Sequence, residues 1–144
     1  MLNAKQLCEL MPHDGLMCLI DSLLHWDDEH LVCSTKTHLR SDNPLRSRDR
    51  LSVIHSAEYG AQAMALHGGL LAQRSGQAPI AGFLVSLRGV KLHRERLDDT
   101  IFPLLITARK LMADSGNLLY AFDLTLNHIP VAEGSAAVMA RREV

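Results

Sequence analysis

The residues best suited to chemistry lie inside the most hydrophobic stretch of the chain, residues 51–73. This stretch carries Glu58, with His55 three residues before it and Gln62 four residues after it. Side chains three or four residues apart share one face of a helix, so a helix here would group a carboxylate, an imidazole and an amide. A carboxylate in apolar surroundings is unfavourable unless it is paired or hydrogen-bonded. Glu58 therefore indicates either a structural network or acid–base chemistry.

Three nearby histidines are candidate partners for Glu58. His38 lies in the polar segment before the helix and could swing toward the site, although a surface loop position is its more ordinary role. For His55, a packed histidine hydrogen-bonded to Glu58 or to a partner chain is likewise the more ordinary role. His67 lies too far along the helix to act with Glu58. The His55–Glu58 pair supplies only half of a metal site, and since further ligands are not evident, no metal is expected.

Hydrophobic periodicity predicts the elements that would position these residues. The long helix has small residues on one face, which allows close approach to a sheet. A run of strands after one helix indicates an α+β fold with the helix against one face of an antiparallel sheet, in a single domain spanning residues 1–144. A curved sheet would explain a helix that is apolar on nearly every side. The predicted elements are a helix at 3–11, strands at 16–26 and 30–37, a polar loop at 38–50, a helix at 51–73, and strands at 80–93, 102–112, 118–126 and 129–141.

Charge and composition exclude several classes of function. The net charge is −1 with acids and bases mixed along the chain, so there is no electrostatic case for nucleic acid or an anionic membrane. The 51–73 stretch is long enough for a membrane span, but a buried helix is favoured by the polar residues inside it, His55, Glu58, Gln62 and His67. The N-terminal residues do not resemble a secretory signal, so we expect a cytoplasmic protein.

The cysteine pattern favours free thiols. Cys8, Cys18 and Cys33 are odd in number and widely spaced, without a C-x-x-C motif. In a reducing compartment such cysteines are more often free than paired. We therefore expect neither a disulfide nor a cysteine-ligated metal.

Several motifs resemble those of the hotdog-fold 3-hydroxyacyl-acyl-carrier-protein dehydratases. The central helix matches the E-x-x-A-Q-A motif of that family, whose glutamate is catalytic. Among family members, the closest resemblance is to the divergent dehydratase-like subunits of aryl polyene biosynthesis. The motifs are Leu10-Met11-Pro12-His13, Leu16-Met17-Cys18-Leu19-Ile20-Asp21, Asn43-Pro44-Leu45, Glu58-Tyr59-Gly60-Ala61-Gln62-Ala63, Gly82-Phe83-Leu84 and Glu133-Gly134-Ser135-Ala136.

The resemblance implies a hotdog fold and a homodimer or hetero-oligomer with another hotdog protein, with active sites at subunit interfaces. It implies thioester substrates carried on the phosphopantetheine of an acyl carrier protein or on coenzyme A, without a further cofactor. Water would leave a 3-hydroxyacyl chain with Glu58 as acid or base, because elimination requires both proton removal and hydroxyl protonation. His38 and His55 are the candidate catalytic partners. The candidate substrate-binding residues are Asn43, Val53, Gln62, Gly82, Phe83 and Leu84.

Two positions depart from the family pattern. Asn43 stands where the family has the catalytic histidine of its H-F-P-G motif, and an asparagine hydrogen-bonds but does not exchange protons at neutral pH. Val53 stands where the family has a glycine at the start of the helix, where free N–H groups would polarise the thioester carbonyl. Two alternatives follow: a catalytically degenerate subunit that partners an active dehydratase, or an acyl thioesterase with Glu58 activating water.

Overall fold

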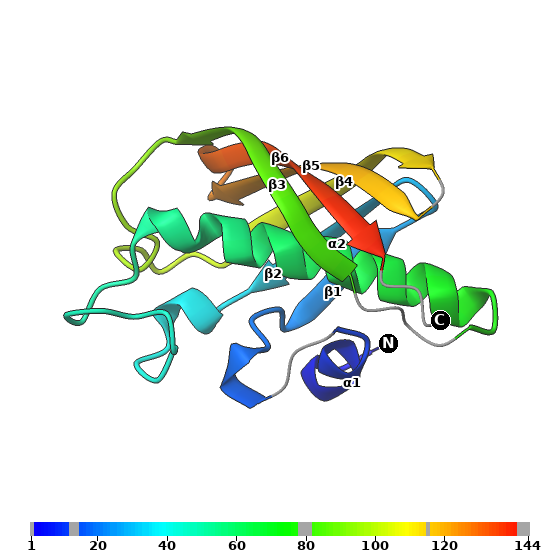
Figure 1. Ribbon diagram of the computed structural model, residues 1–144. Helices are drawn as coiled ribbons and strands as arrows, with labels where there is room; N and C mark the ends of the chain where they lie inside the picture. The colour runs from blue at the N-terminus through cyan, green and yellow to red at the C-terminus, as the bar shows by residue number, and fades with distance from the viewer. Residues whose placement is uncertain (1, 12–14, 78–81, 115, 141–144) are drawn as a thin grey trace.

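The computed structural model describes residues 2–11, 15–77, 82–114 and 116–140 (Figure 1). A six-stranded antiparallel sheet, in the order β1-β2-β4-β5-β6-β3, curves around one long helix, α2. The predicted α+β hotdog architecture is therefore confirmed. The elements are α1 (Ala4–Glu9), η1 (Gly15–Met17), β1 (Ser22–Trp26), β2 (His30–Thr35), η2 (Thr37–Leu39), η3 (Val53–His55), α2 (Ser56–Arg74), β3 (Gly82–Leu92), β4 (Leu104–Asp114), β5 (Asn117–Leu126) and β6 (Ile129–Ala140).

The hydrophobic core lies between α2 and the concave face of the sheet. β4, β5 and β6 form a meander, and β3 pairs with β6 at the sheet edge. Alternation along β4 and β5 sends every second side chain toward α2. The largest fully buried side chains are Tyr59, Tyr120, Leu7, Leu19, Ile20, Leu31, Leu51, Leu66, Leu97, Leu104, Ile106 and Leu124.

Small residues let α2 approach its neighbours closely. A Cβ on Gly60 would lie 2.7 Å from the Phe122 ring of β5, and a Cβ on Gly69 would collide with the carbonyl oxygen of Leu10. Gly68, by contrast, faces open space. The helix continues through both glycines to Arg74, so its packing outweighs their low helix propensity.

The predicted strand at 16–26 is wrong in its first half. The chain forms a 3₁₀ turn at Gly15–Met17, and the strand begins only at Ser22. The physical reason is that the Leu19 N–H and the Met17 carbonyl bond to the side chain of Gln62 rather than to a neighbouring strand. Alternating apolar residues could not reveal this, because a segment held by a helix side chain has the same pattern.

The predicted N-terminal helix is confirmed but shorter. Asn3 caps it, since its side chain accepts the Gln6 N–H while the Gln6 side chain accepts the Asn3 N–H. Residues 80–81 and 141 of the predicted strands lie outside the described residues, as do Pro12 and His13 of the first motif. Among the described helices, none is long and apolar enough to cross a membrane.

The expectation of three free thiols is also wrong. Cys8 of α1 and Cys18 form a disulfide, and Cys33 alone is a free, buried cysteine. The sequence separation of ten residues gave no sign of this pairing, because it depends on how α1 packs back onto the chain that follows it.

Candidate active site

Gln62 fixes the position of Glu58. Its Oε1 accepts the Leu19 N–H at 2.8 Å, and its Nε2 donates to the Met17 carbonyl at 2.6 Å and to Glu58 Oε1 at 3.0 Å. Gln62 is fully buried, whereas Glu58 is half-buried. Both amide hydrogens of Gln62 are thus used within the protein. Its side chain therefore positions Glu58 against the chain at residues 17–19, and a role of Gln62 in substrate binding stays a prediction.

Asn43 is also committed to the protein interior. Its Nδ2 donates to the Thr37 carbonyl at 2.8 Å and to the Tyr59 hydroxyl at 3.1 Å, while its Oδ1 accepts the Leu45 N–H at 2.9 Å. These bonds hold the polar loop onto α2 and bury the amide. Asn43, expected to bind substrate, therefore has a structural role here.

A network of hydroxyl groups was missed by the sequence reasoning. Thr37 Oγ1 donates to the Leu19 carbonyl at 2.7 Å and lies 3.0 Å from the Tyr59 hydroxyl. Burial raises the pKa of Tyr59. Because Gln62 holds the Leu19 N–H and Thr37 holds the Leu19 carbonyl, the backbone at this residue is fixed on both sides. The available signal was the two-residue spacing of Thr35 and Thr37, which places both hydroxyls on one side of the chain.

The structure places His38 in the interior and not on a surface loop. Its side chain is fully buried, its Nε2 lies 2.9 Å from the Phe102 carbonyl, and its Nδ1 has no partner among the described residues. Burial lowers the pKa of His38, so the neutral ring is favoured. His38 is therefore held at the segment before β4, and a catalytic role for it beside Glu58 stays a prediction.

The start of α2 differs from the expected oxyanion site. The Val53 N–H donates to the Glu95 carbonyl at 3.0 Å, and Ser52 Oγ accepts the Ile54 N–H. The expectation that free N–H groups near Val53 polarise a carbonyl is thereby corrected. Half-buried His55 lines a cavity of about 490 Å³ at this end of the helix, together with Leu45, Ser47, Arg48, Arg50 and Ser52.

The remaining predicted residues belong to β3. Gly82 and Phe83 pair with Ala140 and Met139 at the start of this edge strand, where only the backbone is described. Leu84 is 48% exposed. Within one chain these residues therefore form an open sheet edge and are not gathered around Glu58.

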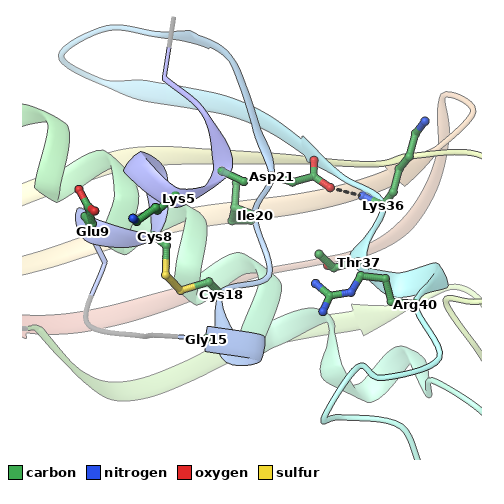
Figure 2. Close-up of a pocket in the computed structure, with 11 residues that line it drawn as sticks. Lys5, Cys8, Glu9, Gly15, Cys18, Ile20, Asp21, Lys36, Thr37 and Arg40 are labelled. Carbon is green, nitrogen blue, oxygen red and sulfur yellow. Dashed lines mark hydrogen bonds between the residues drawn. A yellow bond between two sulfur atoms is a disulfide. The ribbon is translucent and has the colours of Figure 1, made fainter.

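A larger cavity of about 510 Å³ lies beside the segment that Gln62 holds. Figure 2 shows α1 on one side of it and the β2–η2 connection on the other, with the Cys8–Cys18 disulfide in its wall. The Asp21 carboxylate accepts the Lys36 N–H at 2.9 Å. Thr37 lines this cavity and also contacts the Tyr59 hydroxyl. The chain at residues 17–21 lies between the cavity and Glu58, because it lines the cavity and also bonds to Gln62.

One group of side chains in the described part of the chain has metal-ligating spacing, and it lies elsewhere. His25, Asp27 and His30 cluster at the β1–β2 turn. Asp27 Oδ1 accepts the N–H groups of Glu29 and His30 and lies 2.8 Å from the His30 ring. These bonds lower the pKa of Asp27 to about 2. They give Asp27 and His30 a structural role, which is to hold the β1–β2 turn closed.

Comparison with known proteins decides the family. The profile of the ApeP-like family, described as ApeP dehydratase, matches residues 5–144. The chain belongs to this family. A search of curated proteins gives no match.

Solved structures confirm the fold. The dehydratase heterocomplex ApeI:P from Xenorhabdus doucetiae contains a similar chain, with a TM-score of 0.85, 18% identity, and coverage of 99% of this chain and 93% of that one. A hypothetical thioesterase with coenzyme A from Streptococcus pneumoniae is similar with a TM-score of 0.62, 14% identity and coverage of 85% and 86%. Zebra fish thioesterase superfamily member 2 is similar with a TM-score of 0.61 and 16% identity, and the match covers 97% of this chain and 99% of that one. This ApeP-like chain is thus a dehydratase-like hotdog protein.

Proposed function

We propose that this chain is a dehydratase subunit that removes water from a 3-hydroxyacyl thioester, with Glu58 as an acid–base group. The observation that carries the proposal is the hydrogen bond from Gln62 to Glu58 in a chain of the ApeP-like dehydratase family. Elimination moves a proton from the carbon beside the thioester carbonyl and delivers a proton to the departing hydroxyl. A half-buried carboxylate with a fixed orientation is suited to one of these transfers.

The second proton-transfer group would be His55 of this chain or a group of a partner subunit. Asn43 cannot exchange a proton, and the His38 ring faces the Phe102 carbonyl. The exposed edge strand β3 is the proposed contact, because a bare edge with apolar side chains is unfavourable in an isolated chain. Its exposed apolar residues are Leu84, Val85, Leu87, Val90 and Leu92. The similar chain in the ApeI:P structure belongs to a heterocomplex, which supports a second hotdog subunit as the partner.

The proposed substrate is carried by the phosphopantetheine arm of an acyl carrier protein. Exposed Arg48 and Arg50 line the cavity at the start of α2, and guanidinium groups bind phosphate well. Ile54, 66% exposed, adds an apolar contact beside them. Coenzyme A carries the same pantetheine phosphate chemistry, so the assay must compare both carriers. This substrate places the proposed activity in the cytoplasm and requires no further cofactor.

The test is turnover by the protein together with its hotdog partner. We expect Glu58→Gln to abolish dehydration of a 3-hydroxyacyl carrier-protein substrate, while the matched variant Glu95→Gln on the exposed surface retains it. Equal activity of the two variants would contradict the proposal.

The same assay separates the alternatives. Asn43 in a structural role favours one of them, a non-catalytic subunit that stabilises an active partner. In that case Glu58→Gln leaves turnover intact and only variants of the partner abolish it. Release of free thiol without dehydration would instead identify an acyl thioesterase.

A further inference from the structure

The Cys8–Cys18 disulfide joins α1 to the segment that holds the candidate active site. The two Cα atoms are 5.6 Å apart, a usual separation for a disulfide. Both residues are half-buried and both line the 510 Å³ cavity, so a small thiol can reach the sulfur atoms (Figure 2). Cys33 differs in both respects, because it is fully buried and burial raises the pKa of its thiol.

Cys18 stands between the two residues that bond to Gln62. The Met17 carbonyl accepts from Gln62 Nε2, and the Leu19 N–H donates to Gln62 Oε1. The same Nε2 atom donates to Glu58. The disulfide therefore joins α1 to Cys18, the residue between the two that are hydrogen-bonded to Gln62.

The other end of the link is anchored. Leu7 of α1 is fully buried, and the Leu10 carbonyl packs on Gly69 of α2 so closely that a Cβ there would collide with it. α1 is therefore fixed to α2 independently of the sulfur atoms. The disulfide therefore links Cys18 to a helix, α1, that is itself packed against α2.

We propose that Cys8 and Cys18 form a site of reversible thiol–disulfide exchange whose state sets the position of residues 17–19 and, through Gln62, the orientation of Glu58. The effect on catalysis rests on the proposed function. The exchange and its effect on residues 17–19 do not. Disulfides in reducing compartments are commonly redox-active and not structural, which agrees with the proposed cytoplasmic location.

The exchange partner is a dithiol reductant. Its thiolate attacks one cysteine sulfur, breaks the sulfur–sulfur bond and releases the other cysteine as a thiolate. The second thiol of the reductant, as thiolate, then attacks the mixed disulfide. Two electrons pass to the protein, the two protons of the dithiol end on Cys8 and Cys18, and the reductant becomes a disulfide. Oxidation reverses each step with a disulfide oxidant.

The cavity that the sulfur atoms line also carries charged residues. Lys5, Lys36 and Arg40 belong to its lining, and positive charge near a sulfur atom favours the thiolate form. Glu9 and Asp21 also line it, and Asp21 is occupied by the Lys36 N–H. The cavity wall therefore carries one more cation than anions.

The first test measures the thiols. The native protein is equilibrated with glutathione disulfide or with dithiothreitol, alkylated with iodoacetamide and analysed by mass spectrometry. We expect dithiothreitol to add two adducts, on Cys8 and Cys18, while buried Cys33 stays protected. Absence of the disulfide after treatment with glutathione disulfide, or its resistance to dithiothreitol under native conditions, would overturn the proposal.

The second test measures the coupling without any assay of activity. Hydrogen exchange at the Leu19 amide, whose N–H donates to Gln62, should accelerate several-fold on reduction. Cys8→Ser should show the faster exchange in both redox conditions, whereas Cys33→Ser should respond as the wild type does. Unchanged Leu19 exchange in the wild type would overturn the coupling.

A third readout links the site to catalysis. In the active complex, reduction should shift the pH profile of dehydration, and Cys8→Ser should remove the shift. Inactivity of the complex in both states would count against the proposed function alone, because Leu19 exchange still decides the redox proposal. A redox-independent pH profile in an active complex would overturn the link to Glu58.

Discussion

The Glu58 carboxylate accepts a 3.0 Å hydrogen bond from Gln62, one turn later on α2. The same amide satisfies the Leu19 N–H and the Met17 carbonyl, so one buried side chain joins the helix, the segment before β1 and the candidate acid–base group. This arrangement makes Gln62 a positioning residue, and it predicts two separable consequences of its removal.

Gln62→Leu should destabilise the fold by about 2–4 kcal/mol, since it leaves two buried backbone groups without partners. Chemical denaturation measures this loss. The matched control is Gln73→Leu, an exposed position on the same helix, with an expected change within about 0.5 kcal/mol. In the folded variant, Glu58 also loses the donor that fixes its orientation, so turnover should fall. Equal stability of the two variants would refute the role assigned to Gln62.

The fold was predictable because its signals are local and repeated. Small and apolar residues along 51–73, followed by strands of regular alternation, determine a helix covered by a sheet. The segment at 16–21 was not predictable in this way, because its conformation depends on Gln62, more than forty residues away. Alternating apolar residues do not show whether the backbone of a segment is hydrogen-bonded to a neighbouring strand or to a glutamine side chain.

Two adjacent glycines on α2 should respond oppositely to alanine. Gly69→Ala should destabilise the protein by about 1–3 kcal/mol, because its Cβ would collide with the Leu10 carbonyl oxygen, a backbone atom that cannot turn away. Gly68→Ala meets open space and should stabilise the helix by up to about 1 kcal/mol. Thermal unfolding measures both. Equal effects would contradict the close packing of α1 on α2.

Replacing Asn43 by histidine should not restore the family's usual catalytic pair. Asn43 makes three hydrogen bonds, to Thr37, Tyr59 and Leu45, in a buried site that does not fit a larger ring. We expect Asn43→His and Asn43→Ala each to reduce the free energy of unfolding by about 2–3 kcal/mol without a gain in dehydration. Asn117→Ala, at the exposed first residue of β5, is the control. A gain in turnover by Asn43→His would show instead that this position faces substrate.

The site was less predictable than the fold. Glu58 stood out by its type in an apolar helix, but the partners of Gln62, Asn43 and His38 come from distant segments. The residue types indicated that each of these polar side chains needs a hydrogen-bond partner. They did not indicate whether the partner is a substrate or the protein backbone. For these three residues the structure supplies a partner inside the protein.

His67 should make the stability of the protein fall as the solution becomes acidic. Its Nε2 lies 2.8 Å from the Asp27 carbonyl and its Nδ1 lies 2.7 Å from the Tyr120 hydroxyl, an arrangement that suits a neutral ring.

Burial lowers the pKa of His67 in the folded state from 6.5. The unfolded chain therefore binds more protons below that value, so stability is retained above pH 6.5 and lost as pH falls from 6.5 toward the folded pKa. His38 shifts in the same direction for the same reason. Denaturation between about pH 7 and about pH 5 should show a smaller slope for His67→Gln than for the wild type. An unchanged slope in His67→Gln would exclude His67 as a source of the acid sensitivity.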